Sequence, residues 1–115
     1  AVWDLGDQWF QWAGLPFVFA MWTARPGVDL ADAAEALAAA RDAGLANIQR
    51  IAEDEAAAVG LTPGECLRYF QESLHFTLGP AEREGLALFQ RHAVRLGLAP
   101  ADVHLQFEQS AATRI

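Results

Sequence analysis

The stretch LPFVFAMW, residues 15–22, is eight apolar residues in a row, and its conformation decides how the rest of the chain is interpreted. Its side chains show no polar alternation, and residues 23–27 (TARPG) bring in proline and glycine directly after it. A short apolar run with aromatic and β-branched residues between breakers is typical of a strand buried on both faces, with Pro16 acceptable only near its start. We therefore predict one central buried strand here.

Helices are predicted on both sides of this stretch. Asp4 is a suitable N-cap for a first helix, and Gly14 stands where a left-handed residue would end it. Residues 29–59 have helical periodicity, with Asp29 as N-cap and a break into two helices at Gly44.

The second half of the chain carries clear helix signals. Residues 62–65 (TPGE) combine a hydroxyl N-cap, a proline at the first helical position and a glutamate that completes a capping box. The helix that follows is predicted to pass into a short extended stretch at residues 74–78. Pro80 then opens a last helix, which Gly97 closes, and residues 103–107 have the pattern of a weak strand.

These elements do not add up to a complete sheet. A strand buried on both faces needs hydrogen-bonded neighbours, and the chain offers only short, weakly patterned partners for it. Two explanations remain: residues 15–22 form a buried helix of an all-α bundle, or the chain is part of a larger α/β protein. We favour the second, and treat residues 1–115 as a single unit because no linker or repeat divides them.

Composition excludes several classes of function. The 115 residues carry a net charge of −7, and all eight basic residues are arginines without a polybasic run. Nucleic acid and anionic membrane surfaces are therefore poor partners. The longest apolar run is far shorter than the roughly 20 residues of a membrane-spanning helix. No basic, cleavable leader pattern opens the sequence, so we expect a cytoplasmic protein.

No catalytic constellation is complete in this chain. His75, His92 and His104 lack metal-ligand spacing, so we expect no metal site, with His92 capping a helix end and His75 either exposed or in a cleft. Cys66 is interpreted as a buried structural thiol rather than a reactive one. The four tryptophans lie within the first 22 residues and suit either core packing or the wall of a ligand pocket.

One segment carries a family resemblance, through residues 4–6 (DLG), Trp9, Trp12 and residues 14–22 (GLPFVFAMW). The resemblance is to the chorismate dehydratases of the futalosine route of menaquinone biosynthesis. It continues more weakly through 40–45, 69–79, 84–86, Phe89, Ala93, Gly97 and Leu98. These enzymes are about twice as long as this chain. The resemblance therefore implies an α/β protein, the C-terminal half of a two-lobe type II periplasmic-binding-protein-like fold, mostly helical here with one central strand.

The resemblance also implies an activity. Such an enzyme removes water from chorismate to give 3-[(1-carboxyvinyl)oxy]benzoate, a lyase reaction that needs no cofactor. Its partners would be this small dicarboxylate and the absent N-terminal half, which is expected to carry the catalytic residues, so that this chain alone is inactive. The substrate-binding edge expected here is Trp12, Gly14, Leu15 and Pro16, through backbone amides and an indole. Ala13 departs from the threonine usual in the family, so any hydroxyl contact from that position is either lost or not needed.

Two other classes of function stay open. One is a related protein of the same fold, either the 1,4-dihydroxy-6-naphthoate synthase of the same route or a solute-binding protein without catalysis. The other is a helical interaction module that uses its tryptophan cluster to bind a partner protein. Neither the sequence nor the resemblance determines the oligomeric state.

Overall fold

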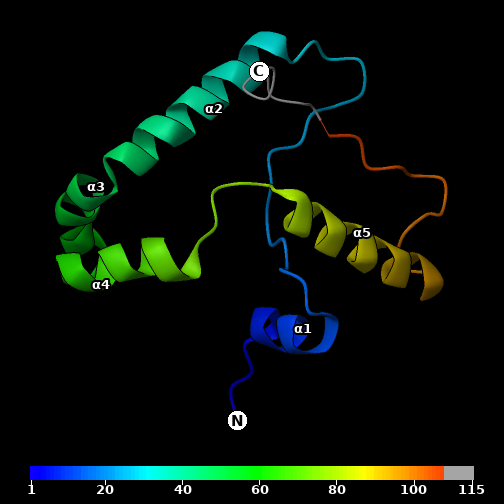
Figure 1. Ribbon diagram of the computed structural model, residues 1–115, viewed down its shortest axis with the longest axis horizontal. Helices are drawn as coiled ribbons and strands as arrows, with labels where there is room; N and C mark the ends of the chain where they lie inside the picture. The colour runs from blue at the N-terminus through cyan, green and yellow to red at the C-terminus, as the bar shows by residue number, and fades with distance from the viewer. Residues whose placement is uncertain (108–115) are drawn as a thin grey trace. The chain divides into compact units, whose positions relative to one another are not determined.

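The computed structural model describes residues 1–107 (Figure 1). Its helical elements are α1 (Leu5–Ala13), α2 (Ala31–Ala46), α3 (Ile48–Glu55), the 3-10 helix η1 (Ala56–Val59), α4 (Pro63–Arg68), the π-helix η2 (Tyr69–Ser73) and α5 (Pro80–Arg95). They fall into two compact units, here called the first unit (Ala1–Thr23 with Thr77–Phe107) and the second unit (Ala24–Phe76).

The predicted central buried strand is wrong, and the α/β fold class fails with it. Residues 15–22 are irregular, and no strand occurs anywhere in residues 1–107, the weak one expected at 103–107 included. Phe19 and Trp22 are exposed by 75% and 84%. A strand is stable when its backbone groups pair with neighbouring strands, and the described chain supplies none. Part of the apolar run packs against helices instead.

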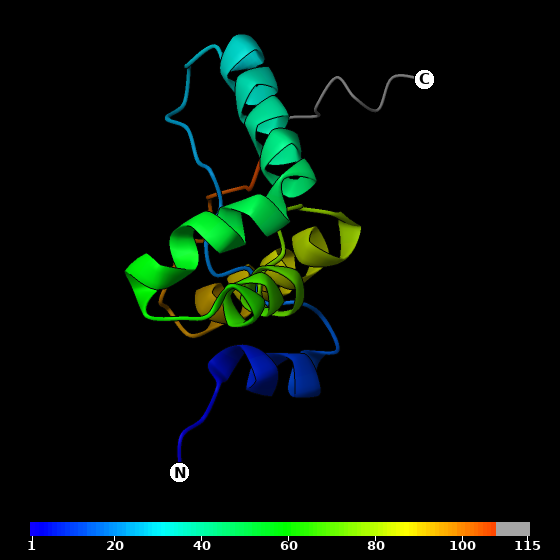
Figure 2. The same cartoon turned by 90° about the vertical axis from the view of Figure 1, so that its left-hand side faces the viewer.

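The second unit is built from consecutive helices whose boundaries differ slightly from those predicted. The Asp29 carboxylate does accept a hydrogen bond from the Ala31 N–H, at 3.1 Å, although Leu30 is the residue that caps α2. The break occurs at Asn47 and not at Gly44. The side chain of Asn47 donates to the Ala43 carbonyl at 2.8 Å and so competes with the helical backbone pattern. The helix axis changes direction there (Figures 1 and 2).

The core of the second unit is made of small side chains. Ala52, Ala56 and Cys66 are 1%, 1% and 3% exposed, and the partly buried Leu67 and Phe70 pack against them. Small residues allow α3 and α4 to approach closely. The prediction that Cys66 is a buried thiol is confirmed.

The helix starts predicted at Thr62 and Pro80 are confirmed. Thr62 and Glu65 form the capping box of α4, in which the Glu65 carboxylate accepts hydrogen bonds from the Thr62 N–H and hydroxyl at 2.8 and 2.7 Å. These bonds favour the charged carboxylate and lower the pKa of Glu65. Helix α5 begins at Pro80 as expected, and Gly97 follows its end with a φ of 72°. None of the helices in residues 1–107 has the length and apolar character needed to cross a membrane.

Candidate functional site

The candidate site lies in the first unit, where α1 ends and the apolar stretch begins. The Asp4 carboxylate starts α1 by accepting hydrogen bonds from the N–H groups of Gly6 and Asp7 at 2.9 and 3.1 Å. Gly14 ends the helix with a φ of 69°, a left-handed conformation that glycine adopts without strain. Both ends of α1 are therefore where the sequence predicted them.

Aromatic rings hold this segment to α5. The Phe17 ring lies 5.8 Å from that of Trp9 and 5.2 Å from that of Phe89, both in edge-to-face arrangements, and Trp9 and Phe89 lie 5.7 Å apart. Such geometries are the preferred ones for aromatic pairs. Three rings from α1, the irregular stretch and α5 thus contact one another, although about 70 residues separate Phe17 from Phe89 in the chain.

Trp12 sits at the border of this cluster. Its ring lies 5.0 Å from that of His92 and 5.5 Å from that of Trp9, yet the residue is 66% exposed. The guanidinium of Arg95 lies 3.0 Å from the His92 Nδ1, which must accept this hydrogen bond because arginine has only donors. His92 therefore packs on the Trp12 indole. It also lies near the end of α5, the position in which the sequence predicted that it caps the helix.

The three remaining predicted site residues differ in what they can offer a ligand. The Gly14 N–H already donates to the Phe10 carbonyl at 2.9 Å, and Pro16 has no N–H. The Leu15 N–H makes no backbone hydrogen bond within residues 1–107. Hydrogen-bond donors at this edge therefore reduce to the Leu15 amide and the Trp12 indole, fewer than the backbone amides predicted.

The electrostatics of this edge are unfavourable to anions. It forms the C-terminal end of α1, where the helix dipole is negative. The Trp12 ring is exposed, and an added Cβ at Gly14 would meet nothing within 4 Å. Both features suit an uncharged face of a ligand better than an anionic group. The arrangement can accept a flat, apolar group and one hydrogen-bond acceptor.

Sequence reasoning missed the residues of α5 that support this edge. A Cβ at the buried Gly85 would overlap the Pro16 carbonyl, and Phe89 and His92 contact Phe17 and Trp12. Phe89 is apolar and fits the pattern of a buried helix face, so Gly85 and His92 are the two residues that were missed. The i, i+4, i+7 spacing of Gly85, Phe89 and His92 was the available signal, but glycine and histidine are not counted as core residues in an apolar pattern.

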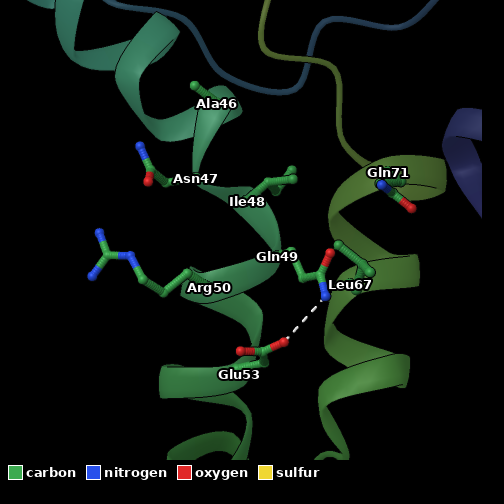
Figure 3. A pocket seen from close by; sticks show the side chains of 8 residues that line it. All are labelled: Ala46, Asn47, Ile48, Gln49, Arg50, Glu53, Leu67 and Gln71. Atoms are coloured by element: carbon green, nitrogen blue, oxygen red, sulfur yellow. Dashed lines mark hydrogen bonds between the residues drawn. The ribbon is translucent and has the colours of Figure 1, made fainter.

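The second unit contains an open hollow of about 540 Å³ (Figure 3). It is lined by Ala46, Asn47, Ile48, Gln49, Arg50, Glu53, Leu67 and Gln71. The amide of Gln49 donates to Glu53 at 3.2 Å, and Arg50 and Asp54 form an exposed ion pair at 3.8 Å. Three of its polar side chains, those of Gln49, Arg50 and Glu53, thus have partners on α3 itself, an arrangement that does not converge on a ligand.

No metal site emerges from the described residues. No group of three His, Cys, Asp or Glu side chains in residues 1–107 is placed to hold an ion. His75 is exposed, and Cys66 lies in the core of the second unit.

Comparison with known proteins assigns the chain to a family. Residues 1–95 match the family described as menaquinone biosynthesis, and the chain belongs to that family. Within it, the chain is 37% identical over 98 residues to a chorismate dehydratase of Thermus thermophilus. The match covers 84% of this chain and 35% of the relative, so the chain spans about a third of the relative's length. No solved structure matches.

Proposed function

We propose that this chain is the C-terminal part of a chorismate dehydratase, a lyase that converts chorismate to 3-[(1-carboxyvinyl)oxy]benzoate in menaquinone biosynthesis. The observation that carries the proposal is the 37% identity to the Thermus dehydratase over 84% of the chain. The resemblance at residues 14–22 supports it, since these residues lie within the matched family region. The full protein would work in the cytoplasm without nucleic acid or membrane partners.

In this proposal, residues 12–16 border the substrate. Trp12 presents an exposed indole face, and Gly14 leaves space beside it. A flat cyclohexadiene ring packs well on an indole, and the Leu15 N–H can donate one hydrogen bond. Loss of water makes the ring aromatic, which supplies driving force, so orientation of the ring is a large part of what the protein must do.

The two carboxylates of chorismate are assigned to the remaining polypeptide. The edge at residues 12–16 lies at the negative end of the α1 dipole, and the chain carries a net charge of −7. Anions are better bound by helix N-termini or arginines, which the other two thirds of a relative's length have room to supply. The catalytic groups belong to the same absent part, and no cofactor is invoked.

The exposed apolar side chains of the first unit support the proposal that another part of a longer polypeptide covers them. Leu5, Trp12, Phe19 and Trp22 are between 66% and 84% exposed, and large apolar side chains exposed to this extent suit a surface that another part of the polypeptide covers. The residues 1–115 would accordingly work as one part of a longer protein.

Activity is tested on the complete protein. Mixed with chorismate, it should consume the substrate and form the benzoate ether, which chromatography with absorbance detection follows. No turnover would contradict the dehydratase proposal, and formation of a naphthoate from its cyclic precursor would favour the sister enzyme. Binding of chorismate without turnover would favour a solute-binding relative.

The role of the edge is tested by a matched pair of glycines. Gly14 and Gly60 both end helices with left-handed φ values of 69° and 72°, and both are open around the Cβ position. Gly14→Val and Gly60→Val therefore carry similar backbone strain. Only Gly14→Val should raise the KM for chorismate, because only Gly14 is placed beside the substrate. Equal KM values in the two variants would exclude this edge from the site.

A further inference from the structure

The stretch that follows α1 rests on α5 through a glycine. Gly85 is buried in α5, and a Cβ built on it would overlap the carbonyl oxygen of Pro16 and lie 3.5 Å from the Leu15 Cβ. The overlapping atom is backbone, which cannot rotate away as the end of a flexible side chain can. The close approach of residues 14–16 to α5 is thus possible only because residue 85 has no side chain.

The same face of α5 holds the stretch at two more points. Phe89 lies four residues beyond Gly85 and packs against the Phe17 ring, and His92 lies seven residues beyond and packs against the Trp12 ring. Residues with this spacing share one face of a helix. Contacts therefore hold the chain to α5 on both sides of residues 14–16. How closely this short loop approaches α5 is then determined by Gly85.

The loop itself has little freedom to compensate. Pro16 has a fixed φ, and the residue before a proline is restricted to extended conformations, which limits Leu15. Gly14 is already held in the left-handed region by its hydrogen bond to Phe10. A methyl group at position 85 would consequently displace the loop as a whole.

We propose that Gly85 is a positioning residue: the missing side chain at this point of α5 sets where Leu15 and Pro16 lie against the substrate. This inference rests on the proposed function, in which residues 12–16 border the chorismate ring. Gly85 touches no substrate atom and acts through the Pro16 carbonyl.

The test compares Gly85→Ala with Gly44→Ala in the complete protein. Gly44 is also inside a helix, but a Cβ there would meet nothing within 4 Å. Gly85→Ala should raise the KM for chorismate by about tenfold or more, because displacements near 1 Å have effects of this size or larger, while Gly44→Ala leaves it unchanged. A merely structural role would reduce the amount of active enzyme and leave the KM alone, and that result would overturn the proposal.

A spectroscopic measurement separates this proposal from the dehydratase assignment. With ¹⁵N-labelled leucine and tryptophan in the complete protein, Gly85→Ala should shift the Leu15 amide and Trp12 indole resonances, and Gly44→Ala should not. If the wild-type protein does not turn over chorismate, the dehydratase assignment fails, and these two resonances still decide the role of Gly85. Unshifted resonances overturn it.

A double variant covers the case in which Gly85→Ala folds poorly. Pro16→Gly loosens the loop and lets its carbonyl move away from the added methyl group. The loss of thermal stability in Gly85→Ala/Pro16→Gly should therefore be smaller than the sum of the two single losses. An additive loss would overturn the proposal.

Discussion

The two units of this chain are stabilised by different kinds of contact. In the second unit, neighbouring helices meet through alanines and a cysteine, and the start of α4 is set by the side chains of Thr62 and Glu65, three residues apart. In the first unit, rings from α1 and α5 meet although they lie at opposite ends of the described sequence. The second unit is thus mainly a product of local signals, whereas the first depends on contacts distant in the chain. Four sets of substitutions test this difference.

The largest effect is expected in the aromatic cluster. Trp9→Ala removes the ring that contacts Trp12, Phe17 and Phe89, and should lower the free energy of unfolding by about 3 kcal/mol. Trp22→Ala, at an 84% exposed position, is the matched control and should change it by less than about 0.5 kcal/mol. Urea unfolding of the chain followed by circular dichroism measures both. Equal losses would mean that the cluster does not stabilise the first unit.

A smaller loss is expected in the core of the second unit. Cys66 is 3% exposed, so Cys66→Ser buries a hydroxyl among apolar side chains and should cost about 2 kcal/mol. Cys66→Ala removes only the sulfur and should cost about 1 kcal/mol. The same unfolding measurement ranks the two variants. A serine variant as stable as the alanine variant would show that water reaches this position.

The capping box of α4 should contribute less to the free energy of unfolding than the core around Cys66, and its contribution should depend on pH. Thr62→Ala removes the N-cap hydroxyl and should cost about 1 kcal/mol at neutral pH. Since folding lowers the pKa of Glu65, its stabilising effect is complete above the unfolded-state pKa and is lost as the pH falls through the folded-state pKa.

Stability profiles of the two proteins from pH 7 to pH 3 provide the check. The wild-type protein should lose part of its advantage over Thr62→Ala at the acidic end and keep the part that comes from the Glu65 N–H donating to the Thr62 hydroxyl. A constant difference across this range would contradict the assigned hydrogen bonds.

The smallest effect is expected to be stabilising. Gly44 has helical backbone and open space around it, so Gly44→Ala should raise the free energy of unfolding by roughly 0.5–1 kcal/mol. Gly60 has equal space but a φ of 72°, so Gly60→Ala should lower it instead, by roughly 1 kcal/mol. Thermal unfolding distinguishes the two signs. A destabilising Gly44→Ala would indicate that α2 packs against something along that face.

Local signals predicted most of the helix ends and failed at the apolar stretch. Asp4, Gly14 and the capping box of Thr62 and Glu65 act within a few residues of the chain, so their effect is visible in the sequence. The break at Asn47 was misplaced to Gly44 because a glycine inside a helix is tolerated, while the competing side chain of asparagine is the stronger interruption.

The candidate site was predicted in part. Trp12, Gly14, Leu15 and Pro16 were singled out through a resemblance, and their role in binding stays a prediction. Their supports on α5, Gly85 and His92, could not be recognised, because nothing in a linear pattern says that a glycine will face a backbone carbonyl some 70 residues away.

Sequence alone was enough to establish the caps of α1 and α4 and the start of α5, that Cys66 is buried, and which family the stretch around residues 14–22 resembles. All of these depend on interactions between near neighbours or on residue identity. Whether residues 15–22 pair as a strand or pack on helices was decided only in three dimensions, because a backbone hydrogen bond or a ring contact needs a partner whose position the local sequence does not encode.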